Sequence, residues 1–388
     1  MKTVAVIFGG RSAEHDISIV TALASIIKPL ELTGSYKVEP VYITKEGAWL
    51  SDEKLKDISL FTSGKIEDFI AKTRPVAIAF DNGLALVKPG GFGSRKTVKI
   101  DIVFPAMHGT YGEDGSLMGL LEMANVPYAG CSLSSSVLAM DKVLAKQIAE
   151  SNGIAVAKYI HISNAEFSEN SEEVIKKVEK SLKFPVFVKP AHLGSSIGIT
   201  RVAKQQDLQN AIEVAVHYDD RVVIEEEIKN LIEVTLPIMG NDELTPALLE
   251  RPLSTAEDFF DFDTKYLRGG KKGGAKKGGT KGAQGYSELP AKLPVKLYGQ
   301  AQNTALNVYR ALGCTGTARV DLLIDKKTQK VYFNEVNPLP GSLYAHNWQA
   351  SGVSSVELVE SLVRLAEERH ERKQQTNTGF TTNFLKQF

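Results

Sequence analysis

The chain has 388 residues, which is more than one ordinary hydrophobic core accommodates, so its length predicts two or three domains. Lysine plus arginine and aspartate plus glutamate balance at 46 each, which argues against a surface built for nucleic acid or for a membrane. No apolar run is long enough to span a bilayer and no signal peptide precedes the first strand, so we expect a cytoplasmic protein without nucleic-acid or membrane partners. Two cysteines, Cys131 and Cys314, have no metal-binding spacing and are predicted to be buried thiols.

The N-terminal third alternates predicted strands and helices. Thr3–Gly10 is an apolar strand that ends in two glycines, and a helix is expected from about Asp16. Strand, glycine turn and helix open a Rossmann-like unit, but the turn lacks G-x-G-x-x-G, so a dinucleotide site is weakly supported. Glu14 at this turn is either a helix-start acid or a ligand-facing group. Further strands are expected at 37–43, 75–80 and 100–105.

A glycine-rich polar loop follows the strand expected at 100–105. His108 in this loop is either catalytic or a loop-structuring residue next to a substrate. A helix is expected from Ser116 to about Ala124, and a single further helix is expected to carry Asp141 and Lys142 and to end at Gly153.

The next segment has the pattern of a phosphate-binding loop. The strand Val186–Pro190 contains Lys189, and Gly194-Ser195-Ser196-Ile197-Gly198 separates it from a second strand at 199–202. Small residues let backbone amides approach phosphate oxygens, and a lysine can neutralise their charge. A plain glycine-rich hairpin is the alternative.

Acidic residues end the following strand, Arg221–Glu226. Glu225, Glu226 and Glu233 are either acceptors for an adenine amino group and ribose hydroxyls or ordinary surface charges. The segment Gly269–Gly285 then contains eight glycines and five lysines, and we expect a mobile basic loop that closes over phosphates, or else a disordered insert. Lys265 and Tyr266, just before it, are better candidates for chemistry.

Two strands near the C-terminus, 318–324 and 330–336, form a predicted hairpin. Because side chains alternate along a strand, Arg319 and Asp321 share one face, and so do Glu335 and Asn337. Only oxygen atoms are offered to a metal there, which suits Mg2+ or Mn2+, and a hard cation held by a few carboxylates usually completes its shell with nucleotide phosphates and water. An edge hairpin with solvated charges is the alternative. Helices are expected at 296–312 and 354–371.

Seven motifs occur together and in order, and together they resemble the D-alanine–D-alanine ligase family of the ATP-grasp superfamily. They are GGRSAEHDIS (9–18), HGTYGEDG (108–115), AMDK (139–142), VKPAHLGSSIG (188–198), KY (265–266), ARVD (318–321) and NEVNPLPG (334–341). The resemblance implies an α/β, ATP-grasp fold of three domains with ATP between the last two. These are a Rossmann-like N-terminal domain at 1–130, a small central α+β domain at 131–228 and a larger α+β domain at 229–375, with a lid loop at 262–290 and a polar tail at 376–388.

The resemblance also implies roles for single residues, with ATP and two Mg2+ or Mn2+ ions as cofactors and D-alanine as substrate. Asp321, Glu335 and Asn337 would hold the metal ions. Arg319 and the Gly341 N–H would stabilise the oxyanion, and Glu14, Ser195 and Tyr266 would orient the first substrate and the lid. His108, Lys265 and His346 are assigned to substrate binding. ATP binding is assigned to Lys142, Lys189, Ser196, Glu225 or Glu226, Ile228 and Glu233.

Two departures from the family pattern concern the lid and the second substrate. The Gly/Lys array replaces a short segment after Tyr266, and His346 stands where the family commonly has a serine that binds the second substrate's carboxylate. Retention of Tyr266 favours a dipeptide product over a depsipeptide. We expect ligation of two D-alanines through an acyl phosphate for peptidoglycan precursor synthesis, by a homodimer. A related ligase with D-serine, D-lactate or another amino acid as second substrate and a non-catalytic nucleotide-binding regulator are the alternatives.

Overall fold

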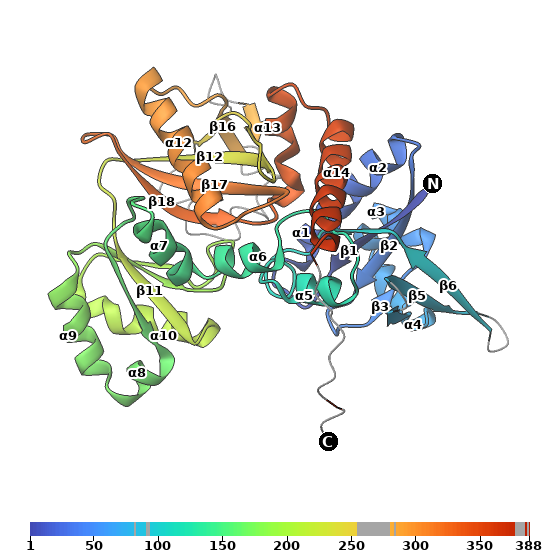
Figure 1. Cartoon of the computed structure of the whole chain (residues 1–388). Coiled ribbons are helices and arrows are strands. Elements are labelled where there is room, and N and C mark those ends of the chain that lie inside the picture. The colour runs from blue at the N-terminus through green and yellow to red at the C-terminus, as the bar shows by residue number, and fades with distance from the viewer. Residues whose placement is uncertain (81–82, 91–93, 254–279, 283–284, 377–384, 386–387) are drawn as a thin grey trace.

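The computed structural model describes residues 1–388 except 81–82, 91–93, 254–279, 283–284, 377–384 and 386–387. Three four-stranded sheets form its framework, and Figure 1 shows them in blue at the right, in green at the lower left and in yellow to orange above the green one. Two smaller three-stranded sheets are attached to them. None of the helices in the described ranges is both long and apolar enough to cross a bilayer.

The N-terminal sheet has the order β3-β2-β1-β7, with β1 parallel to both neighbours. Residues 4–8 of β1 are all at most 1% exposed, because helices or other segments cover both faces of the sheet. Its strands are β1 (Lys2–Gly9), β2 (Tyr36–Ile43), β3 (Trp49–Leu50) and β7 (Ile102–Pro105). Helical segments accompany it: α1 (His15–Val20), a π-helical continuation (Thr21–Ile27), α2 (Lys28–Leu32), a 3-10 turn (Glu53–Lys56), α3 (Ile58–Thr62), α4 (Ile66–Lys72) and α5 (Ser116–Met123).

The strand expected at 100–105 is divided in the structure, which corrects that prediction. A separate antiparallel sheet is formed by β4 (Ala77–Phe80), β5 (Leu84–Pro89) and β6 (Arg95–Ile100), and β7 then begins at Ile102. Asp101 breaks the strand, since its carboxylate accepts a 2.8 Å hydrogen bond from the backbone N–H of Thr3. The apolar residues on both sides of Asp101 predicted one strand, but in the structure they belong to strands of two different sheets.

The single helix expected around Asp141 is also two helices, α6 (Leu133–Met140) and α7 (Lys142–Ser151). Asp141 lies between them in an extended conformation, and its side chain accepts from the backbone N–H groups of Val143 and Leu144. An aspartate at an N-cap satisfies amides that have no partner inside the helix. Lys142 consequently occupies the first position of α7.

The central sheet has the order β10-β9-β11-β8, and all three of its pairings are antiparallel. Its elements are β8 (Tyr159–Ser163), α8 (Asn164–Glu169), α9 (Ser171–Ser181), β9 (Val186–Pro190), β10 (Thr200–Val202), a 3-10 turn (Gln205–Asp207), α10 (Leu208–Tyr218) and β11 (Arg221–Glu226). The predicted strand, glycine-serine loop and strand is present, because β10 pairs with β9 through Thr200 and Val188.

The third large sheet has the order β13-β12-β17-β18 and contains the predicted hairpin as β17 and β18. Its elements, with those of the adjoining small sheet, are β12 (Leu231–Gly240), β13 (Leu244–Pro246), β14 (Arg251–Pro252), β15 (Thr280–Gly282), β16 (Gly285–Glu288), α12 (Val295–Ala311), β17 (Thr317–Asp325) and β18 (Lys330–Asn337). Helix α12 packs its buried apolar residues against this sheet, in one cluster with Cys131 and Cys314. Both cysteines are buried and free, as predicted.

The chain returns to the N-terminal sheet at its end. A 3-10 turn (Gly341–Tyr344) and α13 (Ala345–Ala350) lead to α14 (Ser355–Gln374), whose first turn is closed by a capping box between Ser354 and Glu357. Leu358 and Leu362 of α14 belong to the same buried cluster as Val4 and Ile26. This packing brings the turn after β18 against the N-terminal unit, and Figure 1 shows α14 beside β1.

Candidate functional site

An oxygen-rich face lies on the β17–β18 hairpin. Arg319 pairs with Asn337 and Asp321 pairs with Glu335 across the two strands. The Asp321 carboxylate accepts from Asn337 Nδ2 at 3.1 Å and from Thr235 Oγ1 at 2.5 Å. Asp321, Glu335 and Asn337 therefore lie together, as side-chain alternation predicts, and their donor set is that of a hard divalent cation. Their role as metal ligands stays a prediction.

Arg319 is held in place by Asp321. Its Nε and Nη2 donate to the two carboxylate oxygens at 2.8 and 2.6 Å, and the whole residue is only 8% exposed. Burial would lower the pKa of Arg319, but the Asp321 carboxylate raises it above its ordinary value. The guanidinium carbon also lies 5.2 Å from the ring centroid of Tyr344, a cation–π contact that sequence reasoning missed. The guanidinium is thus a fixed positive charge beside the oxygen-rich face.

The turn after β18 has an unusual backbone. Ser342, Leu343 and Tyr344 all have positive φ, between 52 and 53°, which L-residues adopt only under constraint. Gly341 precedes them, and a Cβ added there would meet nothing within 4 Å, so its backbone borders open space. The role of the Gly341 N–H as an oxyanion donor stays a prediction.

Residues of the N-terminal unit hold this turn. Thr21 Oγ1 accepts from the Ser342 N–H at 2.9 Å and is hydrogen-bonded to His108 Nε2 at 2.8 Å. Glu113 accepts from Gly109 N at 2.7 Å and from Leu339 N at 3.1 Å. Burial lowers the pKa of His108 to about 4, so its ring is neutral at neutral pH. His108 thus contacts the turn after β18 through Thr21, and its assignment to substrate binding stays a prediction.

Glu113 is a further buried acid at this junction, and the sequence predictions gave it no role. Burial, followed by the charge of Glu14, raises the pKa of Glu113 to about 8. Its two backbone hydrogen bonds join the loop 108–115 to the turn after β18. Its position within the quoted HGTYGEDG motif was the available signal.

Glu14 and Ser195 meet, although 181 residues separate them. The Ser195 hydroxyl donates to Glu14 Oε1, and Glu14 is 9% exposed. A Cβ at Gly109 would lie 2.6 Å from Glu14 Oε2, and one at Gly194 would lie 3.4 Å from the same atom. Burial raises the pKa of Glu14, while the Ser195 bond opposes the shift. Two glycine loops thus approach one carboxylate, and the role of Glu14 in holding a ligand stays a prediction.

The loop at 192–198, which has the predicted phosphate-binding pattern, lies beside the first residue of α7. Lys142 Nζ donates to the carbonyl of Leu193 at 2.5 Å and is 3.7 Å from Glu335 Oε2. Ser195 and Ser196 have φ values of 54 and 61°. Lys142, the loop and the oxygen-rich face therefore form one continuous region.

Glu225 forms buried ion pairs with two lysines, Lys189 and Lys146. Lys189 Nζ contacts Glu225 Oε1, and Lys146 Nζ lies 2.8 Å from Glu225 Oε2. Burial would raise the pKa of Glu225, but the two lysines lower it to about 2. Sequence reasoning missed Lys146, whose signal was its position four residues after Lys142 on the same helix face.

Glu225 and Glu226 point in different directions. Glu226 Oε1 accepts from the backbone N–H of Lys183 at 2.9 Å, whereas Glu225 faces Lys189 and is 1% exposed. Ile228 lies in the connection from β11 to β12. Burial would lower the pKa of Lys189, but Glu225, followed by Glu335 and Glu233, raises it above its ordinary value. Glu225 therefore faces the two buried lysines and Glu226 does not, and which of the two acids meets adenine stays a prediction.

His346 is paired with a buried acid. Its Nε2 lies 2.8 Å from Glu250 Oε2, and Asn347 Nδ2 donates to the same oxygen at 3.1 Å. Burial would raise the pKa of Glu250, but His346 lowers it. The His346 ring also lies 4.7 Å from that of Tyr344. Glu250, 96 residues away in sequence, gave no local signal.

Lys265 and Tyr266, predicted in the lid, lie outside the described residues.

Comparison with known proteins gives two family matches that together cover most of the chain. Residues 3–131 match the model of the D-ala D-ala ligase N-terminus, and residues 148–364 match that of the D-ala D-ala ligase C-terminus. The chain is 36% identical over 384 residues to the D-alanine–D-alanine ligase of Chloroherpeton thalassium, covering 96% of this chain and 98% of that protein. It is 37% identical over 384 residues to the corresponding ligase of Acetivibrio thermocellus, covering 95% and 96%.

Solved structures give the same result. The D-alanine-D-alanine ligase from Coxiella burnetii superposes with a TM-score of 0.79 at 27% identity, covering 96% of each chain. The VanG D-Ala:D-Ser ligase from Enterococcus faecalis superposes with a TM-score of 0.75 at 31% identity, covering 94% of this chain and 99% of that one. The architecture is that of an α/β, ATP-grasp protein, which confirms the fold class expected from the sequence. The chain belongs to the D-alanine–D-alanine ligase family.

Proposed function

We propose that this protein joins two D-alanines to D-alanyl-D-alanine at the expense of ATP, releasing ADP and phosphate, for peptidoglycan precursor synthesis. The observation that carries the proposal is the meeting of three regions. These are the oxygen-rich face with Arg319, the loop 192–198 beside Lys142, and the Glu14–Ser195 contact from the N-terminal unit. A ligase of this kind needs a phosphate cradle, a carboxylate-activating face and an ammonium-binding acid within one site. The family membership supports each requirement.

The donor set at the oxygen-rich face fits divalent metal ions. We assign Asp321, Glu335 and Asn337 to two Mg2+ or Mn2+ ions, since carboxylate and amide oxygens suit hard cations. Bound there, such ions would neutralise charge on the phosphoryl oxygens. Arg319 donates to both oxygens of the Asp321 carboxylate, so a cation bound there would share that carboxylate with the guanidinium.

Nucleotide binding is assigned to the buried lysines and the strand-end acids. Lys142 and Lys189 supply positive charge for the phosphates, and Ser196 offers a backbone amide and hydroxyl in the same loop. Glu225, Ile228 and Glu233 form the edge assigned to adenine and ribose, with Glu226 as the less favoured acid. The charge of Lys189 is already shared with Glu225, so phosphate binding would compete with that ion pair.

The chemistry proposed at the site has two steps. The first D-alanine, held by its ammonium group at Glu14, attacks the γ-phosphate of ATP through its carboxylate, giving an acyl phosphate and ADP. The amine of the second D-alanine then attacks that carbonyl, and phosphate leaves. Arg319 and the Gly341 N–H are the proposed oxyanion donors, and one such donor is worth about 3–4 kcal/mol in comparable sites. Ser195 orients Glu14, and Lys265 and Tyr266 are proposed to belong to the lid that excludes water.

The second substrate is assigned to the neighbourhood of His346. Nε2 faces the Glu250 carboxylate, so the donor proposed for the substrate carboxylate is Nδ1–H of a ring that carries a proton on both nitrogens. One solved relative is a D-Ala:D-Ser ligase, so D-serine is the second candidate amine, and His346 in place of the family's serine supports testing it. His108 is proposed to act through the turn at Ser342 rather than on the substrate itself.

Three further assignments complete the proposal: the domain boundaries, the oligomeric state and the cellular compartment. The domains are proposed at 1–130, 131–228 and 229–375, with ATP between the last two, a lid at 262–290 and a polar tail at 376–388. We infer a homodimer, as is common in the family. A reaction that consumes ATP and supplies a cell-wall precursor is proposed to occur in the cytoplasm.

The testing experiment is ATP-dependent phosphate release screened over D- and L-amino acids, with each product identified by mass. The proposal predicts D-alanyl-D-alanine with one phosphate released per dipeptide formed. A mixed product with D-serine would move the assignment to the related ligase. Nucleotide binding without any product would favour the non-catalytic regulator.

A further inference from the structure

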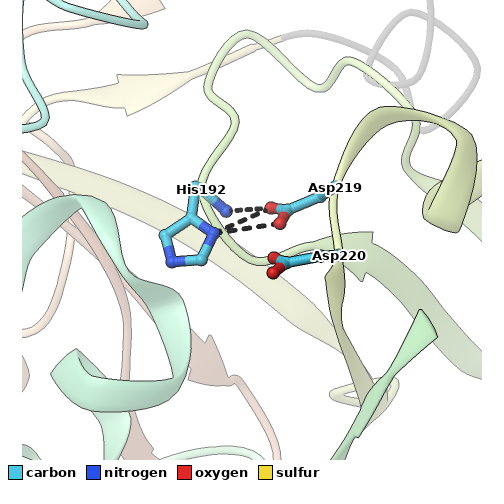
Figure 2. A group of neighbouring side chains, drawn as sticks. All are labelled: His192, Asp219 and Asp220. Atoms are coloured by element: carbon cyan, nitrogen blue, oxygen red, sulfur yellow. Dashed lines mark hydrogen bonds and ion pairs between the residues drawn. The ribbon is translucent and has the colours of Figure 1, made fainter. Parts of the chain in front are cut away.

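A group of charged side chains lies at the start of the loop 192–198, outside the residues assigned to the reaction. Figure 2 shows His192 beside Asp219 and Asp220, and the same ring also contacts Asp141. The backbone N–H of His192 donates to Asp219 Oδ2 at 2.6 Å, and its ring Nδ1 lies 3.0 Å from Asp219 Oδ1. The loop is thus attached at its first residue to the short connection between α10 and β11.

The other side of the ring contacts the N-cap of α7. His192 Nε2 lies 3.2 Å from Asp141 Oδ2, which also accepts from Arg221 Nη1 at 2.9 Å. The other oxygen of Asp141 accepts the first amides of α7. One ring therefore connects three segments: the loop 192–198, the N-terminus of α7 and the connection that leads into β11. We call this set, His192 with Asp141, Asp219 and Arg221, the His192 bridge.

The bridge is an ion-pair network and not a metal centre. A carboxylate faces each ring nitrogen, so both nitrogens act as donors and neither has a lone pair for a metal. Hydrogen bonds to Asp141 and Asp219 raise the pKa of His192 to about 10, against the effect of burial. His192, Asp219 and Asp220 offer ligand atoms within 4.8 Å of one another, but the carboxylates of Asp219 and Asp141 already face the two ring nitrogens.

The loop that follows needs such an anchor. Ser195 and Ser196 have left-handed φ values, a conformation that is unfavourable for L-residues and persists only where the surroundings enforce it. The far end of the loop is fixed by pairing of Thr200 with Val188. The near end has the His192 bridge, next to the Leu193 carbonyl that Lys142 Nζ contacts.

We propose that His192 is a positioning residue for ATP, whose ring holds the loop 192–198 and Lys142 in register so that both meet the same phosphates. It acts through Asp141, which sets the start of α7, and through Asp219, which sets the start of the loop. No contact of His192 with substrate is required. This inference rests on the proposed function, since it assumes that ATP binds at this loop.

The test uses the full-length protein with three variants. His192→Ala removes the bridge, His192→Arg keeps a cation with donors for two carboxylates, and His161→Ala is a matched control at an exposed position of β8 in the same sheet. For each variant, KM for ATP, KM for D-alanine and kcat are measured. Binding of Mg2+ with an ATP analogue that carries a β,γ-imido bridge is measured by calorimetry, and amide hydrogen exchange is measured without nucleotide.

If the His192 bridge positions the loop, His192→Ala should raise the KM for ATP and the Kd of the analogue about tenfold. A tenfold change corresponds to the free energy of one lost charge-assisted hydrogen bond. KM for D-alanine and kcat should change less than about twofold, because no contact with the reacting groups is lost. Amides of 192–199 should exchange faster while those of β9 and β11 keep their rates, which excludes general unfolding. His192→Arg should restore most of the ATP affinity, and His161→Ala should match the wild type.

Unchanged analogue binding and unchanged exchange in His192→Ala would overturn the inference while leaving the proposed function intact. Equal loss of affinity in the alanine and arginine variants would also contradict it, because charge and donors would then be irrelevant. Failure of the wild type to bind the analogue would instead overturn the proposed function.

Discussion

Replacing Asp321 by asparagine is the most informative single change in the site. In the structure its carboxylate takes two hydrogen bonds from Arg319, at 2.8 and 2.6 Å, and two more from Thr235 and Asn337. The asparagine amide would keep one acceptor oxygen. It would lose the negative charge that balances the guanidinium of Arg319, which is only 8% exposed. Removing one partner of a buried ion pair lowers the free energy of unfolding by about 3–5 kcal/mol. Because Asp321→Asn keeps one acceptor oxygen, we expect a loss of about 3 kcal/mol.

The effect on turnover should be larger than the effect on stability. If Asp321 holds metal, Asp321→Asn removes a ligand and transition-state charge stabilisation of about 4 kcal/mol, which is roughly a thousandfold in kcat. Urea unfolding at pH 7 measures the first quantity, and phosphate release with saturating ATP and D-alanine measures the second. Asp325→Asn, at the far end of the same strand, is the control and should change the unfolding free energy by less than about 0.5 kcal/mol.

The reasoning would be refuted by an Asp321→Asn protein that keeps full ligase turnover. A protein that loses about 3 kcal/mol of stability but keeps its activity would show that Asp321 serves Arg319 alone. Asp321→Asn activity that returns at high Mg2+ concentration would agree with the metal assignment, because a weakened site fills at higher cation concentration.

Three further changes test other parts of the site. Glu14→Gln should raise KM for the first D-alanine about tenfold or more by removing a charge-assisted bond to its ammonium, with KM for ATP unchanged; an unaltered KM for D-alanine would contradict the assignment. Glu225→Gln leaves Lys146 and Lys189 without their buried counter-charge and should lower the unfolding free energy by about 3 kcal/mol at neutral pH. Because the pKa of Glu225 is lowered to about 2, its contribution is present above about pH 4.5 and is lost as pH falls through 2, so urea unfolding of the variant should lack that acid dependence. His346→Ala should raise KM for the second amino acid about tenfold in steady-state assays and leave ATP binding alone, whereas equal losses for both substrates would indicate a structural role.

The local elements of the site were predictable because their signals lie close together in sequence. Alternation along two short strands brings Arg319, Asp321, Glu335 and Asn337 to one face, and the hairpin of the structure runs over nearly the same residues. The loop between β9 and β10 was equally predictable, since its glycines and serines stand between two apolar strands.

What sequence could not supply was the pairing of side chains from distant segments. Glu250 meets His346 across 96 residues, and His192 meets Asp141 across 51, with nothing in the local pattern of either partner to indicate it. Asp141 was misread for a related reason. Apolar residues continue with helical spacing on both sides of it, so its capping role appears only when the extended backbone and its two amide bonds are seen.

The central claim is that this chain uses ATP to join D-alanine to D-alanine. The most direct measurement is incubation of the full-length protein with ATP, Mg2+ and D-alanine, with the product identified by mass and phosphate counted in parallel. The account predicts D-alanyl-D-alanine and one phosphate per dipeptide, with neither formed when ATP or D-alanine is omitted. ATP-dependent phosphate release without dipeptide, or no reaction at all, would contradict it.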